Sequence, residues 1–160
     1  MRHRLGIAFA VLLWMLMQAS IASSGTSMAD GVTDRTNLVV GKATTLESVS
    51  PSSKYAVVFE DDGDTGYFYA LDTSKVDNPI VDALQIYNVR SVIDGQTPSI
   101  VEVTWSKSGE QAALLINSYP HAVFDFAGKR GYCRSGFPQP AGEWSAHSHE
   151  WNDSALDFFR

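Results

Sequence analysis

The residues with the clearest chemical potential lie in one short stretch, FEDDGDTGYFYALD, at residues 59–72. Asp61, Asp62 and Asp64 place three carboxylates around a glycine, and Tyr67 opens the aromatic run that follows. Carboxylates this close together repel one another unless a cation or a basic group lies among them. The stretch therefore predicts either a site for a divalent cation or a recognition surface for a basic protein, beside the simplest interpretation as a solvated hairpin tip.

Two known motifs overlap this stretch, and neither fits it. Asp64, Thr65 and Gly66 spell the DTG of aspartic proteases, in which the aspartate follows buried strand residues and two such carboxylates share a proton. Here Asp64 follows two aspartates and a glycine at a turn, and the tripeptide occurs once. The same residues supply only part of the EF-hand pattern, with no glutamate at the far position. We therefore treat the aspartates as candidate binding residues only.

The C-terminal sequence EWSAHSHEWND gathers further candidate ligands. His147 and His149 are two residues apart, so on a strand they would share a face and reach one metal ion together with Glu150. Trp144 and Trp151 flank this group, and they are candidates either for a binding surface or for packing onto a sheet. The metal interpretation and the packing interpretation both stay open from the sequence.

A thiol site is a further alternative. Cys133 is the single cysteine, and it precedes Arg134, whose charge favours a thiolate. A cysteine nucleophile also needs a histidine base, and His121 lies across the same expected hairpin. A metal-dependent or thiol hydrolase is thus the alternative to a binding protein, although a small buried cysteine in the core explains Cys133 equally well.

Composition limits the classes of partner. The 160 residues include 12 basic and 18 acidic side chains, which give a net charge of −6 and argue against binding to nucleic acid. One cysteine excludes an intrachain disulfide and every multi-cysteine zinc site. The size is that of one domain with one core. The chain does not specify an oligomeric state.

The N-terminus has the three parts of a secretory signal peptide. Arg2 and Arg4 precede an uncharged apolar run from Leu5 to Met17, and small residues follow. Residues 1–22 are therefore predicted to direct export to the periplasm or beyond, and the apolar run is too short for a stable membrane span. The alternative is translation from Met28, which would make residues 1–27 a mis-assigned extension and the protein cytoplasmic.

The elements that must position these residues are mainly strands. Residues 23–37 are rich in small polar types and predict a flexible lead-in, followed by a single domain at 38–160. Within the domain, three hairpins are expected from apolar runs that flank the turns DDGD, KSGE and AGKR. They predict an antiparallel sheet of about six strands.

Two helices complete the expected fold. Pro79 suits a first helical position, and Ile80, Ala83, Leu84 and Tyr87 follow a helical period, so a helix is predicted near 79–87. A short C-terminal helix is expected after Asn152 or Asp153, with Leu156 and Phe159 facing inward. The predicted fold class is therefore α+β.

The first and third hairpins also match each other without a gap at an offset of 65 residues. Phe59 aligns with Phe124, and Gly66 aligns with Gly131. Because aromatic hairpins commonly place glycine near the turn, two hairpins that solve one turn problem alike explain the match better than a duplication does.

Five blocks together resemble a small bacterial family of uncharacterised single-domain proteins, one of the domains of unknown function. They are FEDDGDTGYFYALD, IVDALQIYNV, AALLINSYPHAVFDF, KRGYCRSGFP and HEWND, in this order within residues 38–159. The resemblance implies one domain and carries no activity or ligand. From the residues themselves, the leading hypothesis is a non-enzymatic acidic module that binds a basic protein, in the manner of immunity or inhibitor proteins. The alternatives are the hydrolase above and a calcium-stabilised extracellular module.

Overall fold

The fold is described by a computed structural model, which covers residues 33–160. Nine strands follow one another along these residues, and three short 3-10 helices lie after the fifth and the ninth strand. The strands are β1 (Thr33–Leu38), β2 (Thr44–Val49), β3 (Tyr55–Asp61), β4 (Thr65–Asp72), β5 (Ile80–Asn88), β6 (Ser99–Trp105), β7 (Gln111–Ile116), β8 (Tyr119–Asp125) and β9 (Arg130–Cys133). The 3-10 helices are η1 (Val89–Ser91), η2 (Gly142–Trp144) and η3 (Asp153–Phe159).

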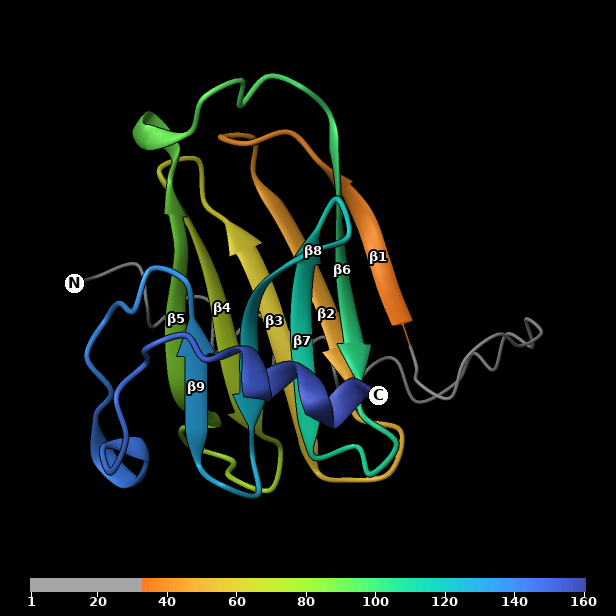
Figure 1. Ribbon diagram of the computed structural model, residues 1–160, viewed down its shortest axis with the longest axis vertical. Helices are drawn as coiled ribbons and strands as arrows, with labels where there is room; N and C mark the ends of the chain where they lie inside the picture. Colours follow the sequence, from red (N-terminus) through yellow and green to blue (C-terminus); the bar gives the residue numbers. More distant parts are fainter. Residues whose placement is uncertain (1–32) are drawn as a thin grey trace.

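The strands form two antiparallel sheets that pack face to face as a sandwich (Figure 1). The five-stranded sheet has the order β1-β6-β7-β8-β9, and the four-stranded sheet has the order β2-β3-β4-β5. β1 and β2 lie along one side of the sandwich, and β5 and β9 lie close together along the other. Strands adjacent in the chain pair from β2 to β5 and from β6 to β9, whereas β1 pairs with β6 and not with β2.

One apolar core fills the space between the sheets. Alternate residues of β6, Val101, Val103 and Trp105, are almost completely buried, as a half-buried strand requires. Phe68 of the four-stranded sheet stacks on Phe124 of the five-stranded sheet, with ring centroids 5.0 Å apart. Burial of such large apolar side chains is the main stabilising contribution to a sandwich of this kind.

η3 covers part of the outer face of the five-stranded sheet (Figure 1). Asn152 caps it, since the Asn152 side chain accepts a hydrogen bond from the Ser154 backbone N–H at 2.9 Å. Ala155 is fully buried, and Leu156 and Phe159 pack with it against the sheet. The expected short C-terminal helix is thus present as a 3-10 helix with the expected cap.

The expectation of an antiparallel β-structure built on three hairpins is confirmed, but the expected α+β class with one sheet of about six strands is wrong. The three hairpins are β3-β4, β6-β7 and β8-β9. β1, β2 and β5 add three further strands, and the nine strands divide into two sheets. The helical segments in residues 33–160 are short 3-10 helices.

The predicted helix near 79–87 is the strand β5. It pairs with β4 along its length, with register shifts that mark two irregular points. Asp82 and Leu84, two residues apart, are buried, which is the period of a strand. The segment also contains Ile80, Val81, Ile86 and Tyr87, types that favour strands, and both periods fit such a short apolar run.

The matching hairpins differ in register. Phe59 lies opposite Phe68 in the first, whereas Phe124 lies opposite Gly131 in the third. The ungapped sequence match is therefore not a structural equivalence.

Two expectations concern the start of the chain. The predicted signal peptide at 1–22 and the alternative start at Met28 lie outside the described residues. β1 begins at Thr33, before the expected domain start at Leu38. Among the described residues, no helix has the length and apolar character that a membrane crossing demands.

Candidate functional site

Asp61, the first of the three candidate aspartates, is buried at the end of β3. It is 1% exposed, and its Oδ2 accepts hydrogen bonds from the Gly41 backbone N–H and the Tyr87 hydroxyl, both at 2.8 Å. Its Oδ1 accepts a third bond from the Gly63 backbone N–H at 2.8 Å. Burial and the bond to Asp61 raise the pKa of Tyr87. Asp61 therefore joins two loops to β5, and its oxygens do not face a partner.

Asp62 and Asp64 form the exposed part of the hairpin tip. Asp62 Oδ1 accepts hydrogen bonds from the backbone N–H groups of Asp64 and Thr65, at 2.9 and 2.8 Å. Partial burial opposes ionisation, but these bonds hold the pKa of Asp62 below its usual range. Tyr67 stacks on Tyr69, with ring centroids 5.7 Å apart. The tip thus presents two carboxylates, one of which already stabilises its own turn.

His149 is the most buried of the candidate ligands. It is 1% exposed, and its Nε2 lies 2.8 Å from Oδ2 of Asp82 on β5, whose side chain is 4% exposed. Its Nδ1 contacts the Pro138 carbonyl oxygen. Both ring nitrogens thus face oxygen acceptors, and Gly131 passes so close that a Cβ there would meet Asp82 Oδ2 at 3.0 Å. The pair binds the C-terminal segment to β5 inside the protein.

The three residues predicted to hold a metal ion do not converge. His149 faces inward to Asp82, whereas His147 and Glu150 are exposed. No group of three or more His, Cys, Asp or Glu side chains in residues 33–160 is arranged to hold a metal ion. The segment that contains the two histidines is not a strand, since it meets β9 in a single bridge between Cys133 and Glu150. The two histidines therefore do not share a face as they would on a strand.

Cys133 and His121 lie on opposite faces of the five-stranded sheet. Cys133 opposes Ala122 in the β8-β9 pairing, and both residues belong to the core between the sheets. The Cys133 Sγ lies 3.3 Å from the Gln85 carbonyl oxygen. His121 is the neighbour of Ala122 on β8, and its ring contacts Tyr119 on the outer face. The thiol and the imidazole therefore do not form a nucleophile and base pair.

The two candidate tryptophans have different environments. Trp144 is 4% exposed and meets Phe124 and Phe126 edge to face, so it is part of the core. Trp151 is half-buried on the outer face, where its indole N–H donates to Asp153 Oδ1 at 2.7 Å. Of the two, only Trp151 lies where a partner could contact it.

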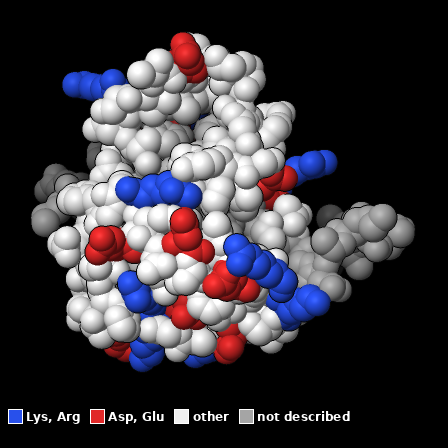
Figure 2. Space-filling view, in the orientation of Figure 1, with Lys and Arg blue, Asp and Glu red and all other residues white. Residues whose placement is uncertain are grey.

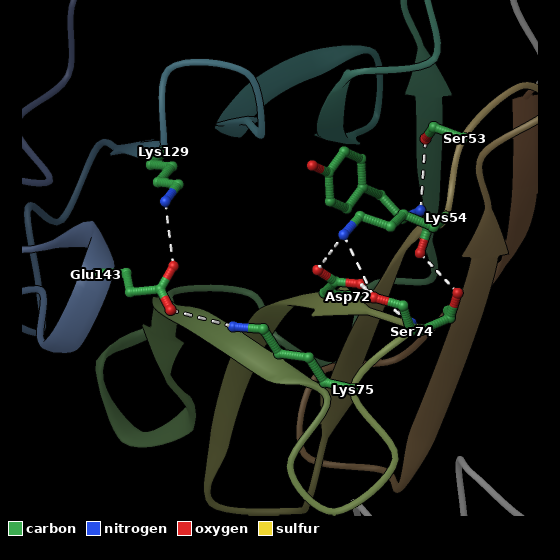
Figure 3. A network of polar contacts seen from close by, with 9 residues as sticks. Ser53, Lys54, Asp72, Ser74, Lys75, Lys129 and Glu143 are labelled. Atoms are coloured by element: carbon green, nitrogen blue, oxygen red, sulfur yellow. Dashed lines mark hydrogen bonds and ion pairs between the residues drawn. The ribbon is translucent and has the colours of Figure 1, made fainter.

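Charged side chains form a small network where the β4-β5 loop meets the β8-β9 turn (Figure 3). Lys129 and Lys75 approach the two oxygens of Glu143 at 3.1 and 3.5 Å, and Lys54 approaches Asp72 at 2.8 Å. The hydrogen bond from Lys129 and the charge of Lys75 lower the pKa of Glu143. Each lysine here has a carboxylate partner, so the network connects loops and offers no unpaired charge.

A second charged feature has no carboxylate partner. The Arg134 guanidinium lies between two aromatic rings on the outer face of the five-stranded sheet, 4.5 Å from the Tyr119 centroid and 4.2 Å from the Trp151 centroid. Its Nε donates to the Pro120 carbonyl oxygen at 2.7 Å. We call Tyr119, Arg134 and Trp151 the aromatic–arginine stack. Within residues 33–160 no carboxylate forms an ion pair with Arg134.

The pairing of β8 with the end of β9 builds this stack. The Arg134 backbone N–H donates to the His121 carbonyl oxygen at 3.2 Å, which places Arg134 beside Tyr119 and His121. The Tyr119 side chain is exposed, at 51%. Burial and the nearby Arg134 charge both lower the pKa of His121, which disfavours its charged form.

The surface around η3 has no continuous patch of one sign. Figure 2 shows acidic and basic side chains interspersed over the lower part of this face, while the upper part is mostly uncharged. The acidic net charge of −6 therefore does not produce an acidic surface here.

Of the stack, sequence reasoning identified Trp151 as a binding candidate and missed Tyr119 and Arg134. The available signal was alternation along two strands. Tyr119 and His121 share a face of β8, and Arg134 follows β9, which is paired with β8 by a short turn. Only the register, which the turn fixes, brings these side chains together.

Comparison with known proteins gives a family and no activity. No solved structure matches the chain. A protein of Haemophilus influenzae (strain ATCC 51907 / DSM 11121 / KW20 / Rd), described as an uncharacterized protein, is 55% identical over 86 residues. The match covers 54% of this chain and 53% of that protein, so the chain spans about half the length of this relative. A family model matches residues 38–160, and the chain belongs to the family described as "Uncharacterized protein conserved in bacteria (DUF2251)", which confirms the resemblance seen in the sequence.

Proposed function

We propose that this domain is a non-enzymatic protein-binding module that contacts its partner through the outer face of the five-stranded sheet. The observation that carries the proposal is the aromatic–arginine stack, an arginine held between two aromatic rings at the surface. Tyrosine, tryptophan and arginine are the residue types that dominate binding energy at protein interfaces. Here one residue of each type is in contact within a single cluster.

The stack is already ordered before any partner binds. The Arg134 side chain is fixed by two ring contacts and by the bond from its Nε to the Pro120 carbonyl. A flexible arginine would lose side-chain entropy on association, and a preorganised one loses less. The exposed Tyr119 ring adds apolar area next to a charged group, which is the usual composition of an interface core.

The placement of the reactive side chains supports a binding role over a hydrolytic one. Cys133 faces the core, and His121 lies on the other face of the same sheet. His149 and Asp82 are paired inside the protein, where a substrate would not reach them. Cys133, His121 and His149 thus take part in packing and in local hydrogen bonds, and they are not arranged as a nucleophile with its base.

We propose the kind of partner from the net charge of the chain and from its cellular location. The net charge of −6 favours a partner with a positive overall charge, as for small immunity or inhibitor proteins. Asp62 and Asp64 at the β3-β4 tip are a second place for such a partner to contact. If residues 1–22 direct export, the partner is periplasmic or extracellular, and with a start at Met28 it is cytoplasmic.

Site-specific photocrosslinking in a bacterium that encodes this protein tests the proposal. A photoreactive phenylalanine at Tyr119 is expected to crosslink to one protein, whereas the same residue at Val76, which is 72% exposed on another loop, is not. Excess purified wild-type domain is expected to compete, and the Tyr119→Ala/Trp151→Ala double variant, shown by circular dichroism to be folded, is not. Equal crosslinking from both positions would contradict the proposal, as would a hydrolytic activity that Cys133→Ser abolishes.

A divalent cation at the β3-β4 tip is a separate proposal with its own measurement. If Asp62 and Asp64 bind calcium, adding it to the purified protein raises the melting temperature and a chelator reverses the change. Asp62→Asn/Asp64→Asn is the matched variant, in which calcium is expected to have no effect. An unchanged melting temperature in the wild type would remove the cation from consideration.

A further inference from the structure

We propose that Arg134 binds a carboxylate group of the protein partner, either an Asp or Glu side chain or a C-terminal carboxylate. The inference rests on the proposed function and adds the chemistry of the contact.

The guanidinium is held so that one edge is left for a ligand. Its Cζ lies over the Tyr119 and Trp151 rings, 4.5 and 4.2 Å from their centroids, and its Nε donates to the Pro120 carbonyl oxygen. No hydrogen bond joins either Nη to another of residues 33–160. The two Nη groups form a planar fork that matches the two oxygens of a carboxylate.

Within residues 33–160, four other Lys and Arg side chains form ion pairs with carboxylates, which Arg134 does not. Lys54 pairs with Asp72, Lys75 and Lys129 pair with Glu143, and Arg160 pairs with Asp157. The chain has more acidic than basic residues, yet Arg134 has no carboxylate partner in residues 33–160. Its guanidinium is therefore available to a carboxylate of another molecule. Arg134 is exposed, so an anion from outside can reach its guanidinium.

A carboxylate fits the surroundings better than a phosphate does. Sites for phosphate groups usually gather several cations around a charge near −2. Here a single guanidinium is present, and burial together with the Arg134 charge lowers the pKa of His121 beside it, which disfavours a second positive charge. Asp153, whose Oδ1 accepts the bond from the Trp151 indole, adds a negative charge close by. One cation next to an acidic residue suits a monoanion.

Titration of the full chain by NMR tests the inference with defined probes. Sodium acetate, N-acetyl-glutamate and inorganic phosphate are added separately at constant ionic strength, and the Trp151 indole N–H and Arg134 Nε–H signals are followed. The two carboxylates are expected to give saturable shifts of both signals. Arg134→Gln is expected to weaken that binding at least about tenfold, which corresponds to 1.4 kcal/mol.

Matched variants make the outcome specific. Arg160→Gln removes an exposed arginine at the C-terminus and is expected to leave the titration unchanged. Arg134→Lys keeps the charge and removes the fork, so binding is expected to weaken although less than in Arg134→Gln. Shifts that are the same in Arg134→Gln, or that appear with phosphate alone, would overturn the inference.

The titration and the crosslinking separate the two proposals. If Tyr119 crosslinks to a protein and Arg134→Gln does not reduce the yield, the module binds a partner and the carboxylate inference fails. If carboxylates titrate at Arg134 and position 119 gives no crosslink, the site exists and the protein-binding proposal fails.

Discussion

Asp61 is a buried carboxylate whose two oxygens are both used by the loops around it. Replacing it with alanine leaves the Gly41 and Gly63 N–H groups and the Tyr87 hydroxyl without their acceptor. Because unsatisfied buried donors are costly, Asp61→Ala is expected to lower the free energy of unfolding by about 2–4 kcal/mol. Urea denaturation measures the change. Asp64→Ala, at the exposed tip, is the control and is expected to change it by less than about 0.5 kcal/mol.

His149 gives a second prediction, with a matched control two residues away. His149→Ala leaves the Asp82 carboxylate buried beside a cavity, with only the Ala83 backbone N–H at 2.9 Å as a donor. Loss of one partner of a buried pair is expected to lower the free energy of unfolding by about 3–5 kcal/mol. His147 is exposed, and His147→Ala is expected to be nearly neutral. Equal effects of the two variants in thermal denaturation would show that the buried pair does not stabilise the fold.

His121 makes stability depend on pH in a defined direction. Burial and the Arg134 charge lower its pKa from the ordinary value of 6.5 in the folded protein, so the unfolded chain binds a proton more readily. Stability is therefore expected to fall as the pH drops below about 6.5, and His121→Gln is expected to reduce this fall. NMR titration of the His121 ring is expected to give a midpoint below 6.5, which moves upward in Arg134→Gln. A midpoint at or above 6.5 would contradict the prediction.

At the residue scale, the sequence shows which side chains could bind a partner, but not whether each of them is buried or exposed. Asp61, Asp62 and Asp64 are adjacent in the chain, but only the fold shows that Asp61 points inward and the other two are exposed. From the sequence, Arg134 is considered as a neighbour of Cys133 and as a basic group that could face the acidic hairpin tip. Alternation places these two side chains on opposite faces, so the charge of Arg134 contributes to the aromatic–arginine stack and not to the thiol.

At the scale of elements, β5 is an edge strand whose outer edge is covered. The loop after β9 reaches it, because the Gln85 N–H donates to the Phe137 carbonyl at 2.9 Å and the Ser135 hydroxyl donates to the Gln85 carbonyl at 2.6 Å. Such cover prevents the edge from pairing with another chain. The segment has the features of a strand, since it pairs with β4 on one side, Gln85 is bonded to the loop on the other, and its buried residues alternate.

Hydrogen exchange tests this role of the loop. The Gln85 amide is expected to exchange slowly, like an amide inside a sheet, although β5 is the last strand of its sheet. Ser135→Ala removes one of the bonds that hold the loop, worth about 1 kcal/mol, and is expected to speed Gln85 exchange by up to about tenfold. Ser148→Ala, in an exposed part of the following segment, is the control. Rapid exchange of Gln85 in the wild type would mean that the loop does not protect the edge.

The sequence predicted the three hairpins, but not the strand β5 or the assembly of the strands. Each of the three hairpins depends on a short turn between apolar runs, and all three were recognised. The pairing of β1 with β6 joins Thr33 to Thr104, far apart in the chain, and no local pattern specifies it. The division into two sheets depends on such distant pairings, so a single sheet of six strands was the simplest arrangement consistent with the hairpins.

At the scale of the whole molecule, Phe124 connects the two sheets and the C-terminal segment. It is fully buried, it stacks on Phe68 of the opposite sheet, and the Trp144 ring lies edge-on to it with centroids 6.0 Å apart. Phe124→Ala is expected to lower the free energy of unfolding by about 3–5 kcal/mol, since it opens a cavity where these three parts meet. Phe158→Ala, at a 38% exposed position, is the control and is expected to cost less than about 1 kcal/mol.

Because the sheets share this one core, neither is expected to unfold alone. Far-UV circular dichroism reports the strands, and tryptophan fluorescence reports the core through Trp105 and Trp144, which are 1% and 4% exposed. Both signals are expected to follow one transition in urea, and Phe124→Ala is expected to move that transition equally for the two signals. Two separate transitions would show that the sheets are independent units, and the aromatic contacts between Phe68, Phe124 and Trp144 would then not be what couples them.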